Sequence, residues 1–270
     1  GLTGVILIRW QKPMIAVLIA LIPCAVSAVY RFGWRTMAVV GTATLFAFMT
    51  EWLFARKRGE PVTSAVFVSA ALLSLSLPPA LPLWVAAIGA VTAILFGKEV
   101  FGGFGRNVFN PALVGRCFIY VCFPLVMTGR WSEHTAGFPG GFGLWATRPI
   151  EAVTGATPLD NLARGQAAPY LDLLLGNRNG SIGETFTIAI LVGAVFLLWR
   201  KAADWKLMAG PLLGMLAMSA ALWLSGVKKA PDPLWAVLGG GFMYVAVFMT
   251  TEPVSAAKTT AGKWVYGVTT

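Results

Sequence analysis

Long apolar runs separated by short polar segments constrain the fold of this chain more than any other feature. Hydrophobic residues occupy 57% of its 270 positions and charged residues only 12%, whereas a soluble domain carries about 25% charged residues. Apolar runs of this length are typical of helices that cross a membrane. The sequence therefore predicts an all-α polytopic membrane protein.

Eight of these runs are expected to form membrane spans. Their bounds are residues 14–30, 37–55, 61–77, 82–96, 107–128, 184–199, 205–224 and 233–250. Several are shorter than the roughly 20 residues that an untilted helix needs to cross the hydrocarbon core. Short spans interrupted by Pro or Gly are typical of binding-site helices in membrane proteins built from repeats.

The distribution of Lys and Arg predicts the orientation of the chain. With the N-terminus in the cytoplasm, the inner loops hold twelve Lys and Arg residues and the outer loops eight, four of them in the polar segment 129–183. Positive charge concentrates in cytoplasmic loops, so this orientation is favoured and segment 129–183 lies outside the cytoplasm. The net charge of +10 does not indicate nucleic-acid binding, because no basic patch is interleaved with aromatic residues.

A weak internal repeat indicates two related halves. The stretch Glu60-Pro-Val-Thr-Ser-Ala65 is similar to Glu252-Pro-Val-Ser-Ala-Ala257, although two unrelated helix starts would also place Pro after an acidic residue. We expect a first transmembrane repeat, an extracytoplasmic loop and a second, incomplete repeat, at residues 1–128, 129–183 and 184–270. Because Trp264 and its successors would open another span, the native protein is expected to continue beyond Thr270.

Metal chemistry is not expected from this sequence. The cysteines Cys24, Cys117 and Cys122 lie in apolar runs without a CxxC pair, so small buried hydrophobic side chains are expected. The single histidine, His134, has no second His or Cys nearby. No spacing suited to a metal site remains.

The polar segment contains the stretch Glu151-Ala-Val-Thr154-Gly155-Ala156-Thr157-Pro-Leu. It resembles the attachment signal of flavin transferases, Asp-x-x-(Ser/Thr)-Gly-Ala-Thr, whose last Thr carries FMN through a phosphoester bond. Thr157 is then the expected carrier, and Thr154, Gly155 and Ala156 complete the signal. Glu151 replaces the Asp, which keeps the charge on a side chain one methylene longer. The alternative interpretation is a surface turn that contains Gly.

A glycine-rich break at residues 101–112 separates the fourth and fifth expected spans. Gly102 and Gly103 expose backbone that must line a cavity or be paired inside the protein. Asn107 and Asn110 lie three apart and are expected to share a helix face, where their amides could bind the edge of a planar heterocycle. Alternatively, Asn107 caps the helix and the glycines pack tightly. Arg106 could stabilise an anionic flavin or a quinone, or anchor the inner membrane face.

A third stretch, residues 173–185, precedes the sixth expected span. Ser181 and Thr185 offer hydroxyl groups near the expected start of that helix, where backbone amides and hydroxyls can hold a phosphate. The carboxylate of Glu184 would satisfy the same amides. A capping role for Glu184 is therefore the alternative to a phosphate site.

In combination, these stretches resemble the membrane-subunit family shared by Na+-translocating NADH:quinone reductase and the Rnf electron-transport complex. The resemblance covers nearly the whole chain and depends most on Leu-Pro-Pro-Ala-Leu-Pro-Leu-Trp84, Gly-Arg-Asn-Val-Phe-Asn-Pro-Ala-Leu, Thr-Gly-Ala-Thr-Pro-Leu, and Leu-Leu-Gly-Asn followed by Gly-Ser-Ile-Gly-Glu-Thr. It implies a ten-helix inverted repeat similar to urea transporters. It also implies covalent FMN on Thr157 and, in the quinone-reductase branch, noncovalent riboflavin near Asn107, Asn110 and a span hydroxyl that matches Ser69.

The resemblance implies electron transfer within a redox-driven complex that moves Na+ or H+ across the bacterial inner membrane. Implied partners are the other subunits, including an extracytoplasmic FMN subunit, a flavin transferase and, in the quinone-reductase branch, quinone. Two alternatives keep the helices without redox work: a urea-transporter-like channel and a structural subunit without flavin. The short segment before the first span is similar to the Rnf branch of the family, whereas Gly-Lys-Glu-Val-Phe-Gly-Gly is closer to the quinone-reductase branch.

Overall fold

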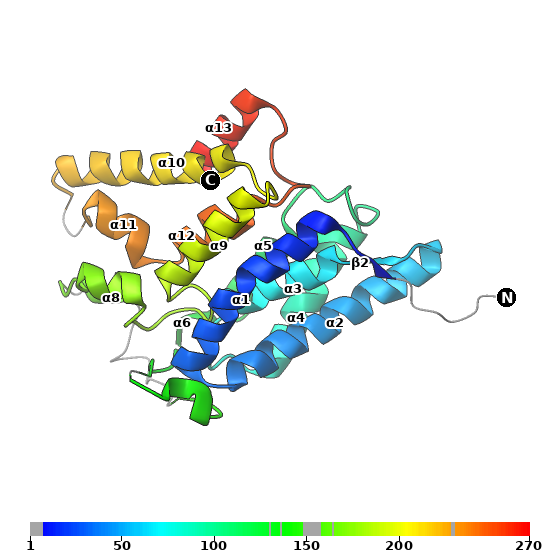
Figure 1. Cartoon of the computed structure of the whole chain (residues 1–270), viewed down its shortest axis with the longest axis horizontal. Coiled ribbons are helices and arrows are strands. Elements are labelled where there is room, and N and C mark those ends of the chain that lie inside the picture. Colours follow the sequence, from blue (N-terminus) through cyan, green and yellow to red (C-terminus); the bar gives the residue numbers. More distant parts are fainter. Residues whose placement is uncertain (1–7, 130, 136, 148–157, 164, 228–229) are drawn as a thin grey trace.

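Helices dominate the chain in the computed structural model, which describes residues 8–129, 131–135, 137–147, 158–163, 165–227 and 230–270 (Figure 1). The elements, in chain order, are β1 (Ile8–Arg9), α1 (Lys12–Phe32), α2 (Arg35–Arg58), β2 (Val62–Thr63), α3 (Ala65–Leu75), α4 (Leu83–Ile94), η1 (Leu95–Glu99), α5 (Pro111–Cys122), α6 (Pro124–Gly129), η2 (Gly140–Gly143), α7 (Pro158–Ala163), α8 (Tyr170–Leu175), α9 (Thr187–Trp199), α10 (Trp205–Leu224), α11 (Pro233–Gly239), α12 (Phe242–Tyr244), η3 (Val245–Met249) and α13 (Thr260–Thr269). Strands β1 and β2 pair in parallel. The segments η1 and η3 are π-helical, and η2 is a 3-10 helix.

Local sequence signals account for several helix ends. Helix α2 ends at Gly59, whose φ of 69° lies in the left-handed region, where glycine has no Cβ penalty. Three basic residues in its last turn, Arg56 to Arg58, favourably face the negative end of the helix dipole. Helix α5 begins where the side chain of Asn110 accepts from Ala112 N and Pro111 takes the first turn.

Three helices of the described chain, α1, α2 and α10, are long and apolar enough to cross a membrane. The expected span 205–224 coincides with α10. The expected span 107–128 is corrected, because its helix begins only at Pro111 and is interrupted at Phe123. The span expected at 233–250 is broken at Gly240, between α11 and α12. The membrane architecture is thus helical, while the ten-helix inverted repeat stays a prediction.

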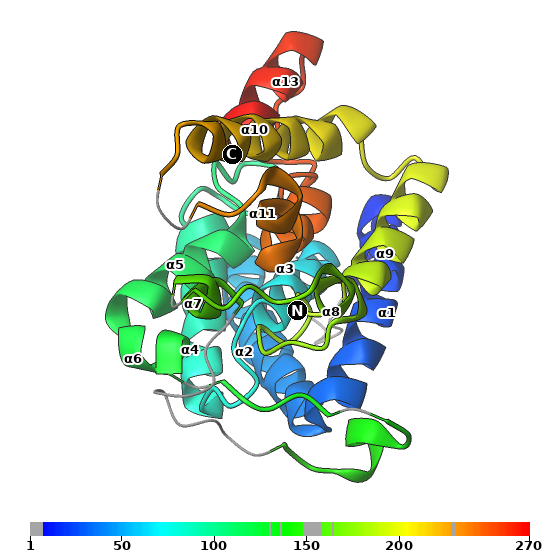
Figure 2. The same ribbon diagram turned by 90° about the vertical axis from the view of Figure 1, so that its left-hand side faces the viewer.

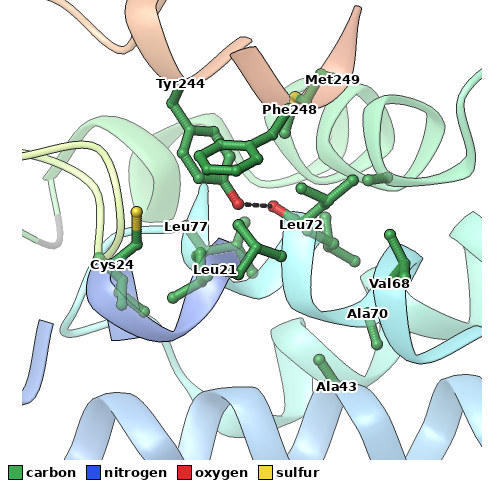
Figure 3. Packing of buried hydrophobic residues seen from close by; sticks show 14 of the residues in the cluster. Leu21, Cys24, Ala43, Val68, Ala70, Leu72, Leu77, Tyr244, Phe248 and Met249 are labelled. Atoms are coloured by element: carbon green, nitrogen blue, oxygen red, sulfur yellow. Dashed lines mark hydrogen bonds between the residues drawn. The ribbon is translucent and has the colours of Figure 1, made fainter. Parts of the chain in front are cut away.

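The buried core centres on two aromatic side chains near the end of the chain. Tyr244 and Phe248 lie with their ring centroids 5.2 Å apart, and Leu21 and Cys24 of α1 lie near them (Figure 3). The hydroxyl of Tyr244 donates to the carbonyl of Leu72, 3.4 Å away. Among membrane helices such contacts stabilise the fold through van der Waals packing, because lipid tails are as apolar as the side chains themselves. This core joins α1 and α3 to the C-terminal part of the chain.

Helix contacts group the chain around that core. Helix α1 packs against α9 and α3, and α2 packs against α3 and α4. Helices α10 and α13 lie side by side at one end of the bundle in both views (Figures 1 and 2). Gly210 and Gly267 allow this approach, because a Cβ on Gly210 would lie 2.8 Å from the Cα of Gly267.

Two helices of this chain end in the same unusual way. Helix α4 continues into the π-helical turn η1, and α12 continues into the π-helical turn η3. Each π turn precedes an irregular segment and then a further helix, α5 or α13. The similar stretches beginning at Glu60 and Glu252 each follow a helical segment, α2 or η3, and precede a further helix, α3 or α13. The division into two repeats and a loop stays a prediction.

Many large apolar side chains point away from the core. Examples are Ile19 and Ile22 of α1 and Leu45 and Leu53 of α2, all at least 45% exposed. Such faces suit contact with lipid rather than water. The expected burial of the cysteines is confirmed for Cys24 and wrong for Cys117 and Cys122, which are exposed.

Candidate functional site

A polar cavity of about 160 Å³ lies where several irregular segments meet. We call it the arginine cavity, because Arg116 of α5 and Arg178 of the loop 176–186 both line it. Its other walls are Trp131, the start of α7 at Pro158 and Leu159, and three glycines, residues 239–241. We call these glycines, which lie at the junction of α11 and α12, the glycine break. The cavity thus joins segments far apart in the sequence.

Arg178 fixes two of these walls to one another. Its side chain is buried, and it donates to the carbonyls of Thr185 at 3.3 Å, Glu184 at 3.0 Å and Leu238. Burial lowers the pKa of Arg178 to about 10, so the guanidinium stays charged at neutral pH. Among the described residues it makes no ion pair. The cavity therefore contains a buried positive charge that is held by carbonyl dipoles.

The second arginine of the cavity is paired. Arg116 Nη1 lies 2.6 Å from Glu184 Oε1, and the carboxylate side chain is only 7% exposed. The expected capping role of Glu184 is wrong, because α9 begins at Thr187 behind the N-cap Phe186, which makes no side-chain cap. Glu184 instead neutralises a cation that would be costly to bury alone.

Thr185 carries an unsatisfied polar atom at the same cavity. Thr185 is 1% exposed, it lines the cavity, and its Oγ1 has no hydrogen-bond partner among the described residues. A buried hydroxyl without a partner costs about 1–3 kcal/mol. Together with the charge of Arg178, this hydroxyl fits a polar, anionic ligand.

A second cavity, of about 550 Å³, is lined in part by Asn110, the N-cap of α5, and by residues of that helix. We call it the aromatic cavity, because most of its walls are aromatic or aliphatic side chains. Its lining comprises Phe96, Phe101, Val108, Phe109, Asn110, Leu113, Val114, Cys117, Phe118, Ser255 and Tyr266. The volume and the few polar groups suit a planar, largely apolar ligand.

Of the two candidate asparagines, Asn110 alone lines the aromatic cavity. The expectation that both share a helix face is wrong, because α5 begins at Pro111 and Asn110 is its N-cap. Asn110 Nδ2 donates to Met249 O at 3.1 Å, a carbonyl at the end of η3. Asn107 donates locally to Phe109 O at 3.2 Å, and it does not cap the helix. Ser69 is buried in α3 and is not among the residues of either cavity wall.

The glycines of the first break pack against guanidinium groups. Gly102 and Gly103 have φ values of 99° and 97°, a conformation that favours glycine. A Cβ on Gly102 would lie 3.1 Å from Arg106 Nη1, and one on Gly103 would lie 3.0 Å from Arg58 Nη2. Arg106 itself is exposed. Tight glycine packing, the alternative interpretation of this stretch, is therefore correct for both positions.

A buried charge cluster supports the same break. Lys98 Nζ lies 2.5 Å from Glu51 Oε2, with both side chains at most 3% exposed. Thr63 completes the group, since its N–H and hydroxyl donate to Glu51 Oε1 at 2.8 and 2.7 Å. Arg58 Nη1 lies 2.6 Å from the buried Glu99 Oε2. Both carboxylates of this cluster therefore have an ion-pair partner, in contrast to the unpaired Arg178, although Glu99 Oε1 has no hydrogen-bond partner among the described residues.

The flavin attachment signal lies outside the described residues. Glu151, Thr154, Gly155, Ala156 and Thr157 are all in the segment 148–157. Pro158, which follows Thr157 directly in the sequence, lines the arginine cavity, as do the two hydroxyl residues of the third stretch, Ser181 and Thr185.

Sequence reasoning missed the two arginines of this cavity. Arg116 lies in the fifth expected span, and a charged residue within an apolar run is a signal of function or pairing that could have found it. Arg178 lies in a polar loop that offers no such signal. Its partners at Leu238 and Gly240 are 60 and 62 residues away, so only the fold reveals its place.

Comparison with known proteins gives a consistent family. The model of the NQR2, RnfD, RnfE family matches residues 8–270. Curated relatives, each named as a subunit of Na+-translocating NADH-quinone reductase, include the protein of Pseudomonas aeruginosa strain LESB58, 40% identical over 80% of this chain, and that of Neisseria meningitidis serogroup B strain MC58, 38% identical over 83%. The protein of Klebsiella pneumoniae strain 342, which has the same name, is 37% identical over 87%.

These matches cover 53%, 56% and 60% of the relatives' own lengths. The chain thus spans a little more than half of the curated relatives it matches. The family match, by contrast, extends over almost all of the chain, including both cavities and the segment with the attachment signal. This chain belongs to the NQR2, RnfD, RnfE family of membrane subunits.

Proposed function

We propose that this chain is a flavin-carrying electron-transfer subunit of an ion-translocating oxidoreductase complex of the Na+-NADH:quinone reductase or Rnf type, with FMN attached to Thr157. One observation carries the proposal. The residue after Thr157, Pro158, lines a cavity with a buried arginine that has no ion-pair partner, and a hydroxyl that has no hydrogen-bond partner, in the described chain. Family membership supports it, since the relatives are named as subunits of such a reductase.

The residues of the chain would position the flavin rather than react themselves. A flavin supplies one- and two-electron redox chemistry when bound, and the protein supplies orientation and electrostatics. The positive charge of the arginine cavity would favour an anionic group, and the helices that surround it would exclude water. Neighbouring subunits, including an extracytoplasmic FMN subunit, would deliver and accept the electrons.

The aromatic cavity is the proposed site of a second, noncovalent flavin, riboflavin, or of quinone. Its phenylalanine walls fit a planar ring system, and Asn110 is its candidate polar contact. Asn110 already bonds Ala112 N and Met249 O, so one amide hydrogen is left for a ligand. Asn107 and Ser69 lie outside this wall. Gly102, Gly103 and Arg106 would act by shaping the break beside it.

The proposed location is the bacterial inner membrane, with the N-terminus in the cytoplasm and segment 129–183 in the periplasm. The distribution of Lys and Arg supports this orientation. The three long apolar helices support the membrane itself. Attachment of FMN to Thr157 would then occur on the periplasmic side, where the flavin transferase would act as a partner.

The test is the intact mass of the denatured chain, purified from cells that express the flavin transferase. The wild-type chain should gain the mass of one FMN less one water, and the Thr157→Val variant should not. Thr128→Val is the matched control, because Thr128 lies outside the signal and its hydroxyl bonds Pro124 O, and this variant should gain the full mass. An unmodified wild-type chain beside a second, modified transferase substrate would contradict the proposal and favour a structural subunit without flavin or a urea-transporter-like channel.

A further inference from the structure

The charges of the arginine cavity do not balance. Arg116 and Glu184 form an ion pair at 2.6 Å. The positive charge of Arg178 therefore has no counter-charge among the described residues. Arg178 bonds only carbonyl oxygens among the described residues. Carbonyl dipoles orient a guanidinium but carry no net charge. The described walls of the cavity therefore hold one excess positive charge, which is the complement of a phosphodiester with its single negative charge.

The unsatisfied hydroxyl of Thr185 is the second, independent observation. Its Oγ1 is buried without a partner in the described chain, and buried polar groups in native proteins are nearly always hydrogen-bonded. The hydroxyl can donate to a phosphate oxygen. Donation to an anionic oxygen is a stronger interaction than a neutral hydrogen bond. Thr185 and Arg178 are neighbours, since Arg178 Nε donates to the carbonyl of Thr185.

The size and position of the cavity indicate which part of an attached flavin nucleotide it could bind, namely the phosphate. Its volume of about 160 Å³ is smaller than the roughly 300–1,000 Å³ of pockets that hold drug-sized ligands, so it suits a small group such as a phosphate better than a whole flavin nucleotide. Thr157 precedes the cavity residue Pro158 in the sequence. Of the parts of an attached flavin nucleotide, the phosphate is separated from Pro158 by the fewest bonds, because it is bonded directly to the Thr157 hydroxyl.

We propose that the arginine cavity is the seat of the phosphate ester, in which Arg178 supplies the charge and Thr185 the donated hydrogen bond that together fix the attached flavin. This inference rests on the proposed function, because it takes Thr157 as the attachment point. Arg178 and Thr185 are positioning residues, and they leave attachment itself to the transferase. Arg116 keeps Glu184 neutralised, so that the carboxylate does not repel the phosphate.

The experiment compares thermal midpoints of the flavin-bearing and flavin-free chains in detergent, for wild type and Thr185→Val. The flavin-free variant should melt at or above the wild-type midpoint, because the change removes an unsatisfied polar atom. The flavin-bearing variant should lose at least half of the rise in midpoint that the flavin gives the wild type. Thr92→Val is the matched control, since the Thr92 hydroxyl bonds its own helix at Ile88 O, and it should retain the full rise.

A second variant and probe keep the inference separable from folding defects and from attachment. Arg178→Lys keeps the charge, whereas Arg178→Gln removes it. Iodide should quench the attached flavin's fluorescence at least twice as strongly in Arg178→Gln as in wild type, and Arg178→Lys should lie between them. Inorganic phosphate should raise the midpoint of the flavin-free wild type but not that of Thr185→Val.

The possible outcomes distinguish a failure of the phosphate site from a failure of the proposed function. A normal mass increase with an unchanged flavin-dependent midpoint and unchanged quenching in both Thr185→Val and Arg178→Gln would overturn the phosphate seat and leave the proposed function intact. An unmodified wild-type chain would overturn the proposed function and this inference with it. A phosphate-dependent rise that Thr185→Val retains in full would assign the phosphate effect to another part of the surface and count against the seat.

Discussion

This chain has two glycine-rich breaks among its apolar helices, one beside each cavity, and they differ in how the charges around them are paired. At the first break, Lys98 neutralises Glu51, and Thr63 donates two hydrogen bonds to the same carboxylate. The adjoining aromatic cavity is mostly apolar. At the glycine break, Arg178 is charged without an ion-pair partner in the described chain, and Thr185 keeps an unbonded hydroxyl. Each buried carboxylate of the first region thus has an ion-pair partner, whereas Arg178 of the second has none among the described residues.

This difference indicates different ligands for the two sites. Apolar walls with paired charges behind them select a planar, weakly charged ring system. A buried cation with free hydrogen-bonding capacity selects an anion. Within one family of membrane subunits, the same device, a helix interrupted by glycine, can thus be adapted to either kind of group by the charges around it.

The largest expected effect on stability is at Lys98, whose ion pair distinguishes the first break from the glycine break. Replacing Lys98 by Met leaves Glu51 as an unpaired carboxylate with a side chain 2% exposed, and breaking a buried pair in this way costs about 3–5 kcal/mol. The free energy of unfolding in detergent should fall by that amount. The double variant Glu51→Gln with Lys98→Met should recover most of the loss. A single variant within about 1 kcal/mol of wild type would show that the first break does not depend on its charge pair.

A second pair of variants compares the packing of one glycine beside the first break with one in the glycine break. A Cβ on Gly97 of η1 would lie 2.6 Å from the backbone Cα of Pro111, whereas a Cβ on Gly240 would meet nothing closer than Leu159 Cδ1 at 3.4 Å. Gly97→Ala should therefore destabilise the fold by about 1–3 kcal/mol through overpacking, and Gly240→Ala should leave it nearly unchanged. Thermal unfolding of both variants checks this, and equal losses would contradict the assignment of open space to the arginine cavity.

A third variant tests whether Asn110 is a structural link. Asn110→Ser keeps an N-cap acceptor for Ala112 but cannot reach Met249 O, so the loss of one buried hydrogen bond should cost about 0.5–1.5 kcal/mol. Asn107→Ala is the control, because Asn107 bonds only within its own loop at Phe109. If Asn107→Ala proved the more damaging change in denaturant unfolding, Asn110 would not be the residue that joins η3 to α5.

The sequence predicted the apolar helices well where local pattern decides, as in α10, whose bounds match the expected span. It failed where a helix start depends on capping chemistry. The spacing of Asn107 and Asn110 indicated a shared helix face, but Asn followed by Pro is itself a start signal, and the helix begins at Pro111.

The arginine cavity was beyond local pattern for a different reason. Ser181 and Thr185 are the candidates that the sequence offers for a phosphate site, yet the expected helix amides are not next to them, since α9 begins at Thr187. The charge comes instead from Arg178, which the fold brings to carbonyls 60 residues further along the chain. Such long-range contacts follow from the packing of the fold, and they cannot be predicted from hydrophobic periodicity or from a sequence motif.

The smallest expected effect concerns the edge of the arginine-cavity region, where Tyr170 of α8 donates to Asp232 at the start of α11. Partial burial alone would raise the pKa of Asp232, but hydrogen bonds from Tyr170 and from backbone N–H groups lower it below its ordinary value. A lowered carboxyl pKa contributes stability that is present above the unfolded-state pKa of about 3.9 and is lost as the pH falls through the folded-state pKa.

Tyr170→Phe should therefore raise the pKa of Asp232 and slightly reduce the loss of stability on acidification. Thermal midpoints from neutral pH down to about pH 3 measure this, with Asp232→Asn as the control that abolishes the carboxyl's titration. Tyr170 is 42% exposed, and exposed pairs contribute little. A large effect at neutral pH would mean that this contact, rather than the carbonyl hydrogen bonds of Arg178, is the main link that holds α11 and the glycine break in place.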